Sequence, residues 1–162
     1  MAERVTTQRR GLVALVGAVA ASALLAFTPT FEGTKLTTYR DLGGVLTYCT
    51  GATEDAQWGK AYTPAQCQAQ LDRDLERHAA GIARCIPLAR LTDGQKVAFV
   101  DAAYNIGVGA FCGSSMARRT NAGDMAGACD ALLMWDKVGG KPVRGLTRRR
   151  QAERELCLRG LP

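Results

Sequence analysis

Two acidic side chains and a hydroxyl group lie close together near the start of the chain. Glu32 is followed by Asp41 and then by Thr47. The four residues that begin at Asp41 read DLGG, and this segment favours a tight turn because glycine tolerates positive φ and aspartate bonds its own backbone. We therefore predict a β-hairpin, with strands at residues 36–40 and 45–48, that carries Asp41 and Thr47.

Paired carboxylates on a small β-element match the requirements of glycosidic bond cleavage. One carboxylic acid must donate a proton to the leaving oxygen, while the other stays ionised on the opposite side of the bond. Glu32 follows Phe31 and an apolar run, which suits it to the first role, and Asp41 at a polar turn suits the second. Two ordinary surface acids can have the same spacing, so spacing alone does not decide between catalytic and structural roles.

Three short motifs around these residues resemble the active-site signature of phage-type lysozymes, glycoside hydrolase family 24. In that family a glutamate, an aspartate and a threonine follow one another at the intervals found here. The three motifs are Glu32-Gly33, Tyr39-x-Asp41 and Gly44-Val45-x-Thr47. Others continue in family order: Ala103-Tyr104-Asn105-Ile106-Gly107, Phe111, Asn121-Ala122-Gly123-Asp124, Trp135, Gly145-Leu146-Thr147-Arg148-Arg149-Arg150 and Glu153. The chain departs from many relatives at residues 48–52, YCTGA, where they have glycine or histidine, so the cleft wall near Thr50 stays undefined.

The resemblance implies an α+β, lysozyme-like fold, with a small β-hairpin lobe at residues 28–62 and a mainly helical lobe at residues 63–162. It also implies an endolysin that hydrolyses the β-1,4 bond between N-acetylmuramic acid and N-acetylglucosamine in peptidoglycan. Glu32 would be the general acid, and Asp41 and Thr47 would position and activate water opposite it. Alternatively, Asp41 would stabilise the oxocarbenium-like transition state. Inversion is the family expectation, but sequence does not supply the carboxyl separation of roughly 6.5 to 9.5 Å that inverting enzymes have.

Substrate-binding residues are expected in both lobes. The resemblance points to Tyr39 beside the hairpin turn and to Tyr104 and Asn105 near the end of a helix. Arg148 belongs to a basic cluster that could meet the peptide carboxylates of peptidoglycan. Packing and capping roles for the tyrosine and asparagine pair, and structural ion pairs for the arginine cluster, remain the alternatives.

Start signals for four helices follow the hairpin region. Thr63, Thr92, Asp124 and Thr147 are all suited to the N-cap position. The first two have a glutamine three residues later, which completes a capping box. We expect the first three helices to end before Pro87, at residue 107 and at residues 139–140, because proline and glycine end helices.

The net charge of +6 favours an anionic partner, either nucleic acid or a bacterial cell wall. No basic platform interleaved with aromatics and no Cys/His finger is present in the sequence, so nucleic acid is not expected. A zinc hydrolase commonly needs two or more histidine ligands, and His78 is the single histidine of the chain. We therefore expect no metal site. The resemblance implies no cofactor, and we expect a monomer.

Residues 1–27 have the form of an export signal. A basic segment with Arg4, Arg9 and Arg10 precedes the uncharged residues 11–27, GLVALVGAVAASALLAF. As a helix this segment would rise roughly 25 Å, short of a hydrocarbon core of about 30 Å, and eight of its residues are glycine or alanine. It resembles the signal-anchor-release segments of some family lysozymes, which are tethered to the inner membrane and then released uncleaved into the periplasm of a Gram-negative host. The alternatives are cleavage at Ala18-Val19-Ala20, which has the small-x-small form of a cleavage site, and a plain buried N-terminal helix.

Six cysteines are spread widely, without the close spacing of a redox or zinc motif. Disulfides persist in an oxidising periplasm, and six cysteines allow fifteen connectivities. We predict a Cys129–Cys157 bond and a bond from Cys49 to Cys67 or Cys85, which leaves Cys112 without an assigned partner. Because Cys49 lies close to Thr47, its pairing could also change between a membrane-held form and an active form.

The chain is therefore interpreted as an export segment at residues 1–27 and a catalytic domain at residues 28–162. Two rival functions stay open. A lytic transglycosylase acts on the same bond with a single acid, so Asp41 would be dispensable. A non-catalytic wall-binding relative would bind peptidoglycan without forming a product, and Glu32→Gln would change nothing.

Overall fold

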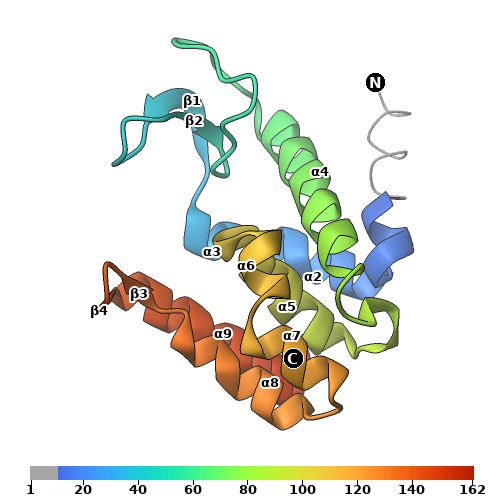
Figure 1. Ribbon diagram of the computed structural model, residues 1–162. Coiled ribbons are helices and arrows are strands. Elements are labelled where there is room, and N and C mark those ends of the chain that lie inside the picture. Colours follow the sequence, from blue (N-terminus) through green and yellow to red (C-terminus); the bar gives the residue numbers. More distant parts are fainter. Residues whose placement is uncertain (1–10) are drawn as a thin grey trace.

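The computed structural model describes residues 11–162, and the basic segment predicted at residues 1–10 lies outside the described residues. A small hairpin lobe sits on a larger helical body (Figure 1). Its strands, β1 (Lys35–Arg40) and β2 (Leu46–Cys49), pair antiparallel, with Tyr39 opposite Thr47. The predicted hairpin is confirmed, and a register irregularity between Lys35 and Tyr39 bends its first strand.

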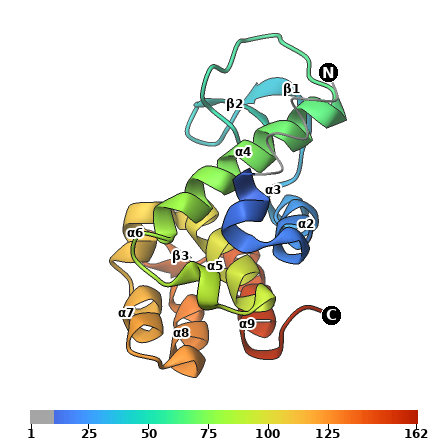
Figure 2. The same cartoon turned by 90° about the vertical axis from the view of Figure 1, so that its right-hand side faces the viewer.

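A long helix, α4 (Pro64–Ile82), runs from the hairpin lobe into the helical body (Figure 2). Its predicted start is confirmed, because Thr63 and Gln66 exchange hydrogen bonds in a complete capping box. The helix ends before Pro87 as expected, but at Ile82, one turn earlier than the last apolar position Ile86, and the chain continues in turns.

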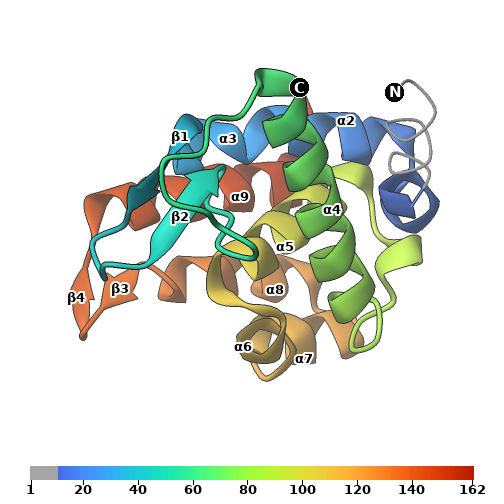
Figure 3. The same ribbon diagram turned by 90° about the horizontal axis from the view of Figure 1, so that it is seen from above.

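The helical body surrounds α5 (Asp93–Ile106), as seen from above in Figure 3. Four consecutive residues of α5, Val97–Val100, are completely buried, so this helix is packed on all sides. It starts at the Thr92–Gln95 capping box and ends at Gly107, as predicted. The remaining helices are α6 (Val108–Cys112), α7 (Ser115–Asn121), α8 (Met125–Ala131) and α9 (Arg144–Arg159), with short 3-10 turns at Leu88–Arg90 and Leu132–Met134.

Two expectations about the C-terminal region are wrong. The helix capped by Asp124 ends at Ala131, and residues 139–140 instead form the turn between β3 (Lys137–Val138) and β4 (Lys141–Pro142). Thr147 does not cap the last helix, which already begins at Arg144. Its hydroxyl donates to Asp136, 2.8 Å away, and so ties α9 to the small hairpin before it.

The N-terminal segment packs as part of the helical body. Residues 11–16 are helical, the helix is interrupted at Gly17 with φ 86°, and α2 (Ala18–Phe27) follows. Leu12, Val16 and Leu24 are completely buried in the main core. Among the described residues, none of the helices combines the length and the apolar character needed to cross a bilayer.

Three disulfides involve all six cysteines. The bonds are Cys49–Cys67, Cys85–Cys112 and Cys129–Cys157. The predicted Cys129–Cys157 bond joins α8 to α9, and the first alternative for Cys49 is the observed one, linking β2 to the start of α4. Each disulfide therefore joins neighbouring elements that lie within one region of the fold.

Candidate active site

Glu32 lies at the end of a one-turn helix, α3 (Pro29–Glu32), that leads from the N-terminal helices into the hairpin lobe. Its backbone N–H donates to the carbonyl of Thr28, 3.2 Å away. Gly33 follows with φ 69°, a conformation that glycine adopts without strain, and directs the chain towards β1. The Glu32 side chain is about one quarter exposed, so its carboxyl group is accessible.

Two hollows meet at Glu32, and Asn105 at the end of α5 lines both of them. The first has a volume of about 330 Å³ and is lined also by Gly51, Thr53, Asp74, Arg77, His78 and Tyr104. The second has a volume of about 320 Å³ and is lined also by Thr30, Phe31, Val143, Gly145, Leu146, Arg148 and Arg149. An extended ligand can therefore pass Glu32 on two sides, with the hairpin lobe above one hollow and α9 beside the other.

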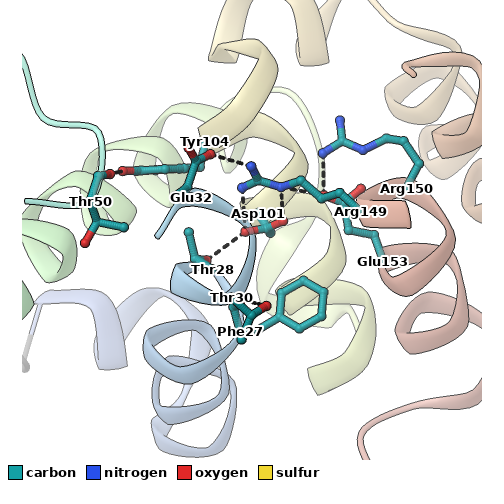
Figure 4. Close-up of polar contacts among 10 residues, drawn as sticks. All are labelled: Phe27, Thr28, Thr30, Glu32, Thr50, Asp101, Tyr104, Arg149, Arg150 and Glu153. Carbon is teal, nitrogen blue, oxygen red and sulfur yellow. Dashed lines mark hydrogen bonds and ion pairs between the residues drawn. The ribbon is translucent and has the colours of Figure 1, made fainter. Parts of the chain in front are cut away.

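The carboxylate of Glu32 forms an ion pair with Arg149 of α9 (Figure 4). The same guanidinium donates to both carboxylate oxygens of Asp101, at 2.8 and 3.0 Å. Burial raises the pKa of Asp101, but the hydrogen bonds and charge of Arg149 outweigh burial, so the pKa lies below its usual value. Thr28 donates its hydroxyl to the same carboxylate at 2.7 Å.

A second buried pair lies behind this network. Arg150 donates to Glu153 at 2.6 Å, and both side chains are completely buried. Burial raises the pKa of Glu153 well above its usual value and lowers that of Arg150, since removal from water opposes both charges. The arginine run that the sequence offered as a binding cluster therefore contains two buried structural arginines, and Arg148 is the member that lines the second hollow without belonging to either pair.

The other predicted catalytic residues lie on the hairpin. Asp41 is exposed at the turn, where its Oδ1 accepts from the amides of Gly43 and Val45 at 2.9 and 2.8 Å. Thr47 is buried and donates its hydroxyl to the Val45 carbonyl at 2.9 Å. Burial raises the pKa of Tyr39, and the negative charges of Asp41 and Glu32 raise it further. The charges of both acids therefore influence the Tyr39 hydroxyl group.

Tyr104 connects the helical body to the hairpin lobe at the first hollow. Its hydroxyl donates to the backbone carbonyl of Thr50, and burial, followed by the charge of Glu32, raises its pKa. A Cβ on Gly51 would lie 3.8 Å from both the Tyr104 hydroxyl and the Glu32 carboxylate. The segment around Thr50, which the resemblance left undefined, is thus the wall of the cleft next to Glu32.

Sequence reasoning missed several residues of this region. His78 lines the first hollow and stacks edge-on against Tyr104, with ring centroids 5.2 Å apart. Its Nδ1 faces the carbonyl oxygen of Asp74 at 2.6 Å and therefore carries the proton. Asp101 had one signal, an acid inside the otherwise apolar stretch at residues 97–103 of α5. Arg149 belongs to the family-order motif at residues 145–150, but nothing distinguished it from its arginine neighbours as the partner of Glu32.

No group of three or more His, Cys, Asp or Glu side chains within residues 11–162 is arranged to hold a metal ion. The groups around Glu32 include carboxylates, hydroxyl groups, a tyrosine and guanidinium groups.

Comparison with known proteins agrees with this geometry. The sequence model of the Phage lysozyme family matches residues 29–153. A SAR-endolysin of Enterobacteria phage PA-2 is 40% identical, over 94% of this chain and 96% of the relative. The endolysin of Escherichia coli O157:H7 phage FAHEc1 superposes with a TM-score of 0.76 at 30% identity, covering 85% of this chain and 92% of that one. The muramidase domain of SpmX from Asticaccaulis excentricus gives a TM-score of 0.77 at 28% identity, covering 86% and 96%. With its hairpin lobe, its helical body and an accessible glutamate between them, the chain belongs to the phage lysozyme family and is an endolysin, a glycoside hydrolase that lyses peptidoglycan.

Proposed function

We propose that the chain hydrolyses the β-1,4 bond between N-acetylmuramic acid and N-acetylglucosamine with inversion, with Glu32 as the general acid. Asp41 and Thr47 orient the attacking water on the opposite side of the sugar ring. Tyr39, Tyr104, Asn105 and Arg148 bind the glycan strand and its peptide stems. The chain acts as a monomer, without a cofactor and without nucleic acid.

One observation carries this proposal: Glu32 is the accessible acid at the point where the two hollows meet. A glycan lying through both hollows would have a glycosidic oxygen next to this carboxyl group. Arg149 supplies positive charge beside the acid once its proton has been transferred, and it would stabilise the resulting carboxylate.

A specific observation also favours the rival transglycosylase. The Oδ1 atom of Asp41 already accepts two turn amides, which is a structural role that requires no part in catalysis. A transglycosylase would use Glu32 alone and leave 1,6-anhydro ends on the muramic acid, whereas a hydrolase leaves reducing ends.

The test compares three variants of the full-length chain on purified peptidoglycan. Glu32→Gln should lower the rate by about a hundredfold or more, because it removes the general acid. Asp41→Asn keeps an oxygen for the turn amides but removes the charge, and should also abolish most activity. Glu155→Gln, a half-exposed acid of α9 paired with Arg159, is the matched control and should change little.

Mass spectrometry of the product ends, with NMR of the anomer first released, separates the functions. Reducing ends, loss of activity in both acid variants and initial release of the inverted anomer support the proposed hydrolase. Anhydro ends with an active Asp41→Asn identify a transglycosylase. Peptidoglycan binding without product in every variant, including the unaltered chain, identifies a wall-binding relative.

The same proposal includes the place where the chain acts. Residues 1–27 serve as a signal anchor that tethers the chain to the inner membrane, and the released chain acts on peptidoglycan in the periplasm of a Gram-negative host, with residues 28–162 carrying the catalytic groups. The name SAR-endolysin of the relatives supports this location. The uncharged run at residues 11–27 supports it too.

Fractionation of producing cells tests the location. Intact protein of 17.3 kDa should occur first in the inner-membrane fraction and later in the periplasm. A shorter periplasmic form that starts near residue 21 would show cleavage of an ordinary signal peptide. Protein that stays only in the cytoplasm would overturn the proposed export.

A further inference from the structure

Three elements that are distant in sequence meet at the buried carboxylate of Asp101 in α5. Thr28, at the junction of α2 and α3, donates its hydroxyl to Oδ1 at 2.7 Å. Arg149 of α9 donates to both oxygens of Asp101. Thr28 and Asp101 are completely buried and Arg149 is 3% exposed, so these contacts are shielded from water (Figure 4).

The network forms a closed ring that includes Glu32. The Glu32 carboxylate contacts Arg149, Arg149 contacts Asp101, and Asp101 accepts from the Thr28 hydroxyl. The Thr28 carbonyl then accepts the backbone N–H of Glu32 at 3.2 Å. Both the backbone and the carboxyl group of Glu32 are therefore fixed through one buried aspartate.

The two contacts of Asp101, with Arg149 and with Thr28, have different roles. The Arg149–Asp101 ion pair alone could be a stabilising contact within the core. Thr28, however, is a neutral donor that also ends α2 and starts α3, since its N–H donates to Leu24 at 3.0 Å. Its hydroxyl thus sets where the short α3 helix lies against Asp101, and the position of α3 sets where Glu32 meets Arg149.

We propose that Thr28 and Asp101 are positioning residues for the glycosidase reaction: together they fix the place and orientation of the Glu32 carboxyl group. This inference rests on the proposed role of Glu32 as the general acid. Neither residue lines the two hollows that meet at Glu32. Their loss should therefore reduce kcat and leave KM unchanged, because a misplaced reacting group costs rate while the glycan still binds.

The test uses Thr28→Val, which keeps the shape of the side chain and removes only the hydroxyl. We expect kcat on peptidoglycan to fall by about tenfold with an unchanged KM. Thr28→Ser restores the donor and should return kcat to within about twofold of the unaltered chain. The control is Thr120→Val in α7, which also loses a buried hydroxyl bond, to Met116 at 2.8 Å, but has no part in the ring.

All rates are measured well below the unfolding temperature of each variant, so that loss of stability alone does not lower kcat. A lowered kcat in Thr28→Val with normal kcat in Thr28→Ser and Thr120→Val supports the inference. Equal kcat in Thr28→Val and the unaltered chain overturns it. An equal loss of kcat in Thr120→Val also overturns it, because the effect would then be general.

Asp101→Asn provides a second test through the other member of the pair, alone and combined with Thr28→Val. Its kcat should fall by at least tenfold, and Thr28→Val should add almost nothing in this background, because both act through the same atoms. Independent, additive losses would contradict a shared route. The Glu32→Gln chain is assayed in parallel: if it remains active, the proposed acid is wrong, whereas an inactive Glu32→Gln beside a normal Asp101→Asn refutes only the positioning role.

Discussion

Replacing Arg149 by methionine should destabilise the protein more than any exposed arginine replacement. The guanidinium contacts Asp101 through two hydrogen bonds and pairs with Glu32, and its Nε lies 3.6 Å from Glu153. Asp101 and Glu153 are both completely buried. Removing one partner of a buried ion pair costs about 3 to 5 kcal/mol, because the remaining charge is left without compensation. That amount is a large part of the 5 to 15 kcal/mol that is typical of a domain.

The assay is urea unfolding at pH 7, followed by circular dichroism, for a double-mutant cycle. Arg149→Met alone and Asp101→Asn alone should each cost about 3 to 5 kcal/mol. The double variant should cost no more than either single variant, which gives a coupling energy of the same size, about 3 to 5 kcal/mol. The control is Arg154→Met in the same helix. Arg154 pairs with Asp130 at 2.6 Å on the surface, with side chains 34% and 56% exposed, so its loss should cost less than about 1 kcal/mol. A cost below about 1 kcal/mol for Arg149→Met, or strictly additive effects in the cycle, would refute the reasoning.

Three further predictions concern other parts of the fold. Replacing Cys129 and Cys157 by alanine opens a loop with a sequence separation of 28 and should lower the free energy of unfolding by about 3.6 kcal/mol in urea titrations; an unchanged midpoint would contradict this. Because Asp101 has a lowered pKa in the folded state, its stabilising contribution is complete above its unfolded pKa of about 3.9 and is lost as pH falls through the folded value. The stability difference between the unaltered chain and Asp101→Asn should therefore shrink below about pH 4. A difference that grows as the pH falls would contradict the lowered pKa of Asp101. Leu12→Ala should cost about 2 to 5 kcal/mol in the released protein because Leu12 is completely buried, whereas Val19→Ala, at a position 59% exposed, should stay within about 0.5 kcal/mol.

Local signals predicted local structure well. The DLGG turn formed the hairpin, and the threonine–glutamine pairs at residues 63–66 and 92–95 formed capping boxes at the first turns of α4 and α5. In each case the residues that form the hydrogen bonds are a few positions apart, so one short segment of the sequence contains both partners. Family resemblance then supplied the order of the elements, which these signals do not contain.

Helix ends and the buried charges were harder to predict. Asp124 marked the start of α8, but nothing nearby indicated its end at Ala131, because the chain there turns to pack Leu132 into the core. Arg149 looked like one more surface arginine, yet its partners Asp101 and Glu32 lie 48 and 117 positions away. Contacts over such separations depend on the packing of whole elements, so no local sequence pattern predicts them.

The N-terminal segment combines features that suit two environments. In the folded chain Leu12, Val16, Ala20 and Leu24 recur every four residues and are completely buried on the helical body, where each large side chain contributes about 1.5 to 3 kcal/mol. The side chains on the exposed face are those of residues 14, 17, 18, 22 and 26, all alanine, glycine or serine, and of Val19. That face offers little apolar surface to water, so the packed segment does not leave a large exposed apolar patch.

The same face offers little apolar surface to lipid. A segment of this kind would be retained in a bilayer mainly by its leucines and valines. In the folded chain Leu12, Val16 and Leu24 are completely buried, whereas Val19 stays exposed. If the segment leaves the membrane as proposed, packing Leu12, Val16 and Leu24 against the protein would offset part of the apolar burial that it loses. In the folded chain Thr28 meets Asp101 directly after α2, so the burial of the N-terminal segment is continuous with the contact that we propose positions Glu32.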